Sequence, residues 1–155
     1  MDPLSIAAGA AGLAGFAIQA SNLIYQYVSD VKSADSTLSL LYSEVKALQS
    51  GLESVDSTFR SREVVRYYKS AANDRLQSAQ LLSNVRPLLT DCESTLAKLN
   101  DVLGSIEGSG SKRGIFRKPV QAFKLNSKSD DINLIRHQIR SYSGAMQMTL
   151  QMVGM

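Results

Sequence analysis

The 155-residue sequence predicts an all-α fold. Only 6% of the residues are aromatic and there is no Trp, while Leu, Ala, Ser, Lys and Gln recur at short spacing. Apolar residues also return every three or four positions over several long segments, which is the periodicity of helices that bury one face. A chain of this length can bury one hydrophobic core. We therefore predict a single helical domain over residues 1–155.

The first predicted helix covers residues 3–31 and begins at Asp2-Pro3, because proline is tolerated at the first helical position. Residues 3–29 carry no charged side chain, and the first two thirds of this segment are small and apolar. Gly9, Gly12 and Gly15 each lower helix stability by about 1 kcal/mol relative to Ala. We expect this loss of helix stability to be offset by close approach of another backbone or by contact with lipid.

Three further helices are predicted at about 35–60, 70–107 and 129–153. Pro87 lies within the third helix, where we expect a kink or a break because proline removes one backbone hydrogen bond. Gly104, Gly108 and Gly110 end that helix and open a flexible basic loop at about 108–128. Ser129 caps the last helix. The apolar stripe of the second helix is Leu38, Leu41, Tyr42, Val45, Leu48, Leu52, Val55 and Phe59, and that of the last helix is Ile132, Ile135, Ile139, Tyr142, Met146, Leu150 and Val153.

The positive charge of the chain is concentrated in one segment. The formal net charge is +3, yet residues 109–129 hold six basic side chains and no acid, so the rest of the chain nets −3, from 11 basic and 14 acidic residues. A basic patch on a near-neutral body is typical of a surface that binds anions or membranes, and equally of a solvated loop. The six residues are Lys112, Arg113, Arg117, Lys118, Lys124 and Lys128.

The sequence predicts no catalytic, cofactor or metal site. One cysteine, Cys92, and one histidine, His137, cannot supply the four ligands of a metal site. The N-terminal glycines follow no strand, which excludes a dinucleotide-binding loop. We expect Cys92 to be a small core residue and His137 to lie at the surface, and we predict that the protein is not an enzyme. A single cysteine fits a reducing compartment.

The N-terminal apolar segment has features of both a secretion signal and a membrane span. A signal peptide requires a basic start, whereas this chain has Asp2 and no Lys or Arg there. A span requires about 20 apolar residues, and the clean run of residues 4–18 is shorter, with Gln19, Ser21 and Asn22 beyond it. The segment is therefore marginal as a permanent span, which suits conditional insertion.

Four segments, MDPLSIAAGAAGLAG, LLYSEVKALQSGLESV, LLTDCESTLAKLNDVL and QAFKLNSKSDDINLIRHQIRSYSGAMQMTLQ, together resemble the N-terminal domain of fungal STAND (NACHT-type) receptors and related cell-death effectors, the HeLo-like class. The resemblance covers essentially the whole chain. It implies an all-helical bundle of four to five helices, similar to necroptosis-type four-helix executioner domains. It also implies a domain that is cytoplasmic at rest, clusters with an NLR-type receptor or an amyloid-signalling partner, and then permeabilises the plasma membrane through its N-terminal helix.

The resemblance and the residues indicate the same site. Small residues spaced four apart let helices approach closely in lipid, and the family's glycine zipper maps onto Gly9, Gly12 and Gly15, although here the glycines are three apart. The predicted insertion and self-association residues are Ala7, Ala8, Gly9, Ala11, Gly12, Gly15 and Phe16, and the six basic residues above are the predicted contacts to anionic phospholipid.

Two alternatives remain open at this point. The small residues would serve only to seat the first helix deeply in the bundle, or the domain would be a non-lytic signalling and oligomerisation adaptor. Nucleic acid is not a predicted partner, because Phe116 and Phe123 are better explained as apolar anchors than as stacking residues. We expect the regulatory portion to be missing from this sequence or encoded separately.

Overall fold

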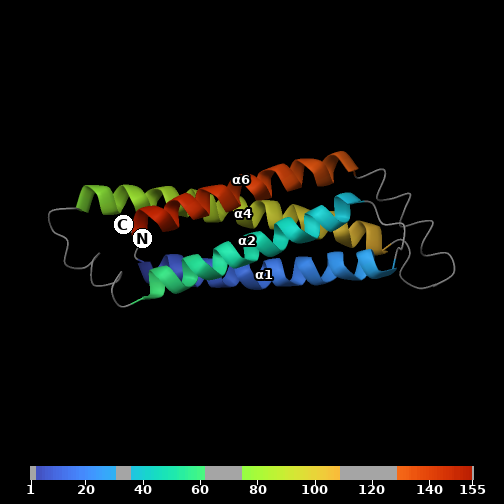
Figure 1. Ribbon diagram of the computed structural model, residues 1–155, viewed down its shortest axis with the longest axis horizontal. Helices are drawn as coiled ribbons and strands as arrows, with labels where there is room; N and C mark the ends of the chain where they lie inside the picture. The colour runs from blue at the N-terminus through green and yellow to red at the C-terminus, as the bar shows by residue number, and fades with distance from the viewer. Residues whose placement is uncertain (1–2, 31–35, 62–74, 109–128, 155) are drawn as a thin grey trace.

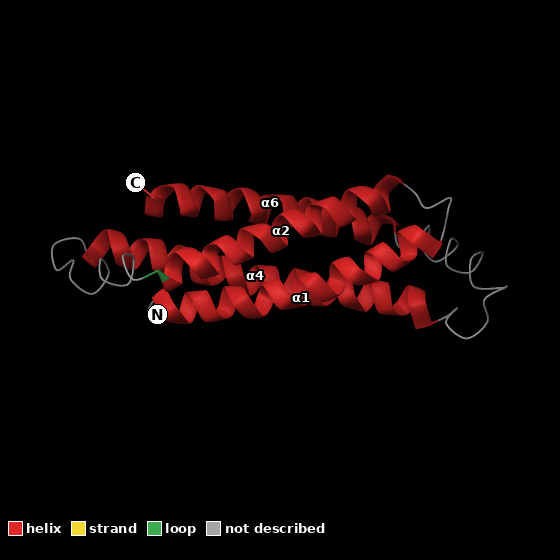
Figure 2. Ribbon diagram, turned by 60° about the horizontal axis from the view of Figure 1, so that its bottom comes forward, coloured by secondary structure: helices red, strands yellow, loops and turns green. Residues whose placement is uncertain are grey.

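The computed structural model describes residues 3–30, 36–61, 75–108 and 129–154. These ranges hold four helices, α1 (Pro3–Asp30), α2 (Ser36–Arg60), α4 (Arg75–Gly108) and α6 (Ser129–Gly154). Apart from Ser61 at the end of α2, every described residue is helical (Figure 2). The predicted all-α bundle is confirmed, with four helices in the described part of the chain.

Successive helices run in opposite directions along one elongated bundle (Figure 1). The most extensive packing joins α1 to α2, and α1 also lies against α4, while α6 lies against both α2 and α4. The bundle is therefore two antiparallel pairs, α1 with α2 and α4 with α6, laid side by side. In this arrangement α1 runs parallel to α4, and α2 runs parallel to α6 (Figure 1).

The helix ends have local chemical causes. Pro3 opens α1, where its missing backbone donor has no partner to lose. Asp130 and Asp131 lie in the first turn of α6, where negative charge is favourable next to the helix macrodipole. At the end of α2, the backbone N–H of Ser61 donates to the carbonyl oxygen of Thr58 at 3.3 Å, and the Ser61 hydroxyl donates to the same oxygen at 2.9 Å.

Pro87 does not divide α4, which is one helix from Arg75 to Gly108. Of the two predicted outcomes, a kink or a break, the break is excluded. Pro87 is exposed, whereas its neighbours Val85 and Leu89 are buried. The ring and the missing hydrogen bond are therefore on the solvent side of the helix, where water can satisfy the released carbonyl.

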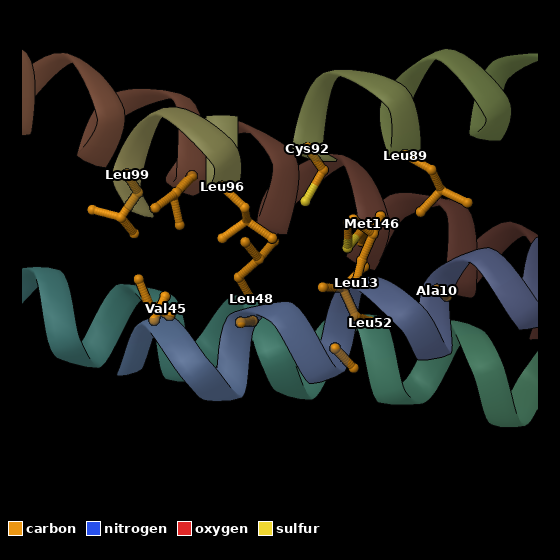
Figure 3. Packing of buried hydrophobic residues seen from close by; sticks show 14 of the residues in the cluster. Ala10, Leu13, Val45, Leu48, Leu52, Leu89, Cys92, Leu96, Leu99 and Met146 are labelled. Atoms are coloured by element: carbon orange, nitrogen blue, oxygen red, sulfur yellow. The ribbon is translucent and has the colours of Figure 1, made fainter. Parts of the chain in front are cut away.

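The core is built from one apolar stripe of each helix (Figure 3). In α2 every residue of the predicted stripe is at most 1% exposed except Tyr42, which is half-buried. Leu96 and Leu99 of α4 face Val45 and Leu48 of α2 across the centre of the bundle (Figure 3). Burying each such side chain contributes roughly 1.5–3 kcal/mol, so hydrophobic packing is the main stabilising term.

Two polar contacts fix α6 against its neighbours. Arg136 donates from Nε to Glu44 Oε2 at 3.0 Å and from Nη2 to Glu44 Oε1 at 2.9 Å, which joins α6 to α2. Thr95 of α4 is 3% exposed and donates its hydroxyl hydrogen to Gln138 Oε1 at 3.3 Å. Its oxygen lies 2.9 Å from the Tyr142 hydroxyl, which then acts as donor. These directional contacts set the rotation of α6 about its own axis.

Candidate functional site on the outer face of α1

The inner face of α1 is lined by alanine. Ala7, Ala10, Ala14, Ala17 and Ala20 are at most 5% exposed. Ile6, Leu13 and Ile24 complete the buried stripe. Small side chains let the α1 backbone lie close to its neighbours, and α1 makes its most extensive contact with α2. The alternative in which small residues seat α1 deeply in the bundle therefore accounts for these alanines.

The glycines of α1 lie on the opposite side of the helix. Gly9, Gly12 and Gly15 are all exposed. A Cβ atom added at Gly12 or Gly15 would meet no atom within 4 Å, and at Gly9 it would meet only Leu89 Cδ1, at an ordinary van der Waals distance of 3.7 Å. Packing of the bundle does not require these glycines, although each lowers helix stability by about 1 kcal/mol relative to alanine.

The outer face of α1 also lacks charge and exposes large apolar side chains. Leu4 is 46% exposed, Ile18 38% and Tyr25 59%. These three residues belong to a seam with alternating spacings of four and three, the spacing by which helices pair in coiled coils. The seam is exposed except at the half-buried Ala11, and it consists of Leu4, Ala8, Ala11, Gly15, Ile18, Asn22 and Tyr25.

The predicted insertion residues are divided between these two faces. Ala8, Gly9, Gly12 and Gly15 are exposed, whereas Ala7 is fully buried in the core. Ala11 and Phe16 are half-buried at the boundary. Ala7, Ala11 and Gly15 are spaced four apart, but they do not share one face of α1, because four residues advance a helix by about 40° beyond a full turn.

The six predicted lipid-contacting basic residues, Lys112, Arg113, Arg117, Lys118, Lys124 and Lys128, lie outside the described residues.

A groove of about 390 Å³ lies between α1 and α4, beside two of the exposed glycines. Gly9, Gly12 and Phe16 line it from α1, and Arg86 and Glu93 line it from α4. Sequence reasoning did not identify the two charged residues, because the sequence does not show which part of α4 lies beside α1. The sequence does show that these two opposite charges are seven positions apart, which places them on the same side of one predicted helix.

The described residues contain no group of three or more His, Cys, Asp or Glu side chains arranged to hold a metal ion. Cys92 is fully buried, and burial raises the pKa of its thiol to about 12. The thiol is therefore protonated at neutral pH, which makes it a poor nucleophile. His137 is exposed.

Among the described residues, α1 is the one helix long and apolar enough to cross a membrane by length and composition. The qualifying segment is Pro3–Gln26, 24 residues, and 44% of the apolar window within it is buried in the bundle. A buried core helix of a protein in water meets the same criterion. The two interpretations differ in what the exposed half of α1 contacts.

These features define a small all-α bundle whose N-terminal helix presents an uncharged, glycine-containing outer face. Comparison with known families matches the chain over residues 1–155 to the family described as "Pigment biosynthesis cluster protein PigL N-terminal", and the chain belongs to this family. No curated protein and no solved structure matches the chain. The match does not extend to the HeLo-like class, so that finer resemblance stays a prediction.

Proposed function

We propose that this domain is a non-enzymatic, HeLo-like module that oligomerises and permeabilises membranes by inserting α1. In this proposal the domain is cytoplasmic at rest and acts at the plasma membrane, under the control of an NLR-type receptor or an amyloid-signalling partner. The observation that carries the proposal is the outward position of Gly12 and Gly15, where an added Cβ atom would have no neighbour within 4 Å. These glycines weaken the helix without improving the packing of the bundle.

The physical requirements of insertion match the composition of α1. At 1.5 Å per residue, Pro3–Gln26 extends about 36 Å, and a bilayer's hydrocarbon core is about 30 Å thick. Because residues 3–29 carry no charge, no charged side chain within this segment has to leave water on insertion. In lipid, close packing at small residues drives helix association. Gln19, Asn22 and Gln26 would gain hydrogen-bond partners from other copies, so we expect insertion to be cooperative.

Dye release from lipid vesicles tests this proposal. The purified domain, both free and artificially clustered, is added to phosphatidylcholine vesicles with and without phosphatidylserine. We expect release that depends on the anionic lipid, and we expect Gly12→Glu to lower it at least tenfold. The matched control is Gly144→Glu on α6, an exposed glycine whose added Cβ would also meet no atom within 4 Å. This control is expected to release dye like the wild type.

Folding of each variant is measured by circular dichroism and urea denaturation. A Gly12→Glu variant that unfolds would contradict the interpretation that Gly12 has no role in the core. Removal of residues 1–20 is a poor test, because it deletes Ile6, Ala10 and Leu13 from the core. A variant with the six basic residues changed to glutamine tests the lipid contact, since each basic side chain contributes about 1 kcal/mol near an anionic surface.

The second candidate is a non-lytic adaptor that binds a partner helix. The exposed seam of α1, with its four-and-three spacing, favours this alternative, since such a seam also matches a helix of another protein. No release from any vesicle by folded, clustered protein would refute permeabilisation and favour the adaptor.

A further inference from the structure

The groove between α1 and α4 has two chemically different ends. Ser5 of α1 and Arg86 of α4 line one end, and Phe16 and Glu93 line the other. Gly9 and Gly12 lie between them on α1, and Leu89 and Thr90 lie between them on α4. The α1 wall of the groove therefore has no side chain at Gly9 or Gly12, and the α4 wall carries opposite charges at its two ends.

Both charged residues lie at the surface of the described bundle. Arg86 and Glu93 are exposed, and neither forms an ion pair with any other described residue. They are seven positions apart, so they project from the same side of α4, two turns or about 10 Å apart. Thr90, between them, donates its hydroxyl hydrogen to the carbonyl oxygen of Arg86 at 3.1 Å, within its own helix.

We infer that two copies of this chain associate through this face as an antiparallel two-fold pair, with the two grooves facing each other. A two-fold axis that crosses α4 between Leu89 and Thr90 places Arg86 of each copy opposite Glu93 of the other. An isologous interface needs such self-complementarity, in which each contact occurs twice.

The same two-fold axis also passes through the midpoint of the α1 side of the groove. Its lining there extends from Ser5 to Phe16, so its midpoint lies between residues 10 and 11. A Cβ atom at Gly9 would lie 3.7 Å from Leu89, which places the two midpoints at nearly the same height along the bundle. The axis then sets Gly9 of one copy opposite Gly12 of the other. Because neither residue has a Cβ, the two α1 backbones can approach closely.

The inference is independent of membrane activity, since pairing is measured in buffer without lipid. If the proposed function also holds, the pair covers Gly12 and keeps the glycine face of α1 from contacting lipid. In that case the pair is a resting state, and its dissociation precedes insertion.

Sedimentation velocity from about 1 to 500 μM tests the inference on the whole chain. The wild type is expected to show a monomer–dimer equilibrium that weakens between low and high salt, because exposed charges are screened. R86E and E93R, tested separately, are each expected to raise the dimer dissociation constant at least about tenfold, because like charges then face each other at both ends of the pair.

The decisive sample is an equimolar mixture of R86E and E93R. One variant carries acidic side chains at both ends of the groove and the other basic ones, so the mixture is expected to form a heterodimer although neither variant pairs with itself. K98E is the control, because Lys98 is exposed on another side of α4 and the substitution changes net charge as R86E does. Circular dichroism checks that every variant is folded.

A wild type that stays monomeric over the whole range would overturn the inference and leave the groove to another occupant, such as an acyl chain or a partner helix. It would equally be overturned by a dimer that persists in R86E, or by a mixture that does not associate. None of these outcomes depends on dye release, so failure here is distinct from failure of the proposed function.

Discussion

Replacing Gly12 and Gly15 with alanine is expected to stabilise the domain. Each added Cβ would enter space with no atom within 4 Å, so the change adds no steric strain. Alanine in an exposed helix interior is favoured over glycine by about 1 kcal/mol, partly because it restricts the unfolded chain. The G12A/G15A double variant should therefore gain about 2 kcal/mol in the free energy of unfolding, which raises Tm by roughly 4–8 °C in a chain of this length.

Urea denaturation followed by circular dichroism at 222 nm measures this gain. G144A is the control, because Gly144 has the same open surroundings on α6 and should gain about 1 kcal/mol. The reasoning is refuted if G144A is stabilised while G12A/G15A is unchanged or destabilised. That result would show that the α1 glycines contribute to the resting fold. A stabilised double variant that releases less dye than G144A would instead separate the resting fold from the proposed membrane role.

Three further predictions concern the interior of the bundle. E44A should lower the free energy of unfolding by about 2 kcal/mol in urea denaturation, because it leaves the largely buried Arg136 guanidinium without its carboxylate; R140A, whose side chain is 59% exposed and 3.9 Å from Glu44, should change it by less than about 0.5 kcal/mol. T95V should lose about 1 kcal/mol by the same measurement, because it removes a buried hydroxyl that joins α4 to α6. Burial raises the pKa of Cys92 from 9.0 to about 12, so the unfolded chain loses the thiol proton at a lower pH than the folded chain does. The free energy of unfolding should therefore fall as pH rises above 9, by up to about 1.4 kcal/mol per pH unit. C92A should lack this component, and equal pH dependence of the free energy of unfolding in the wild type and C92A would contradict the prediction.

The sequence predicted the helices that have one apolar face. In α2, apolar residues alternate with polar ones at helical spacing, so only one side can be buried, and Leu41, Leu48 and Phe59 are indeed fully buried. In α1 almost every side is apolar, and the pattern alone does not distinguish a buried face from an exposed one. The assignment of Ala7 to the core and Gly15 to the surface depends on contact with α2 and α4.

Sequence patterns also did not predict the contacts between helices, because a pattern within one helix does not show which helices are neighbours. Glu44 and Arg136 are 92 positions apart, and their pairing requires that α2 and α6 be neighbours with these two residues at the same level along the bundle. The groove likewise depends on the axial position of α4 beside α1. Helical periodicity gives the angular position of each residue around its helix axis. It contains no information on which other helix lies against that side.

The extensive packing of α1 on α2 has a consequence for any movement of α1. The side of α2 that faces the bundle includes Leu41, Leu48 and Leu52, none of which is exposed. Each α2 side chain that loses its cover when α1 leaves would cost roughly 1.5–3 kcal/mol, so a few of them together approach the whole stability of a typical domain. A departing α1 therefore leaves behind a second apolar surface. That surface has to be covered by lipid or by another chain, so α2 is as much a part of any activated state as the helix that leaves it.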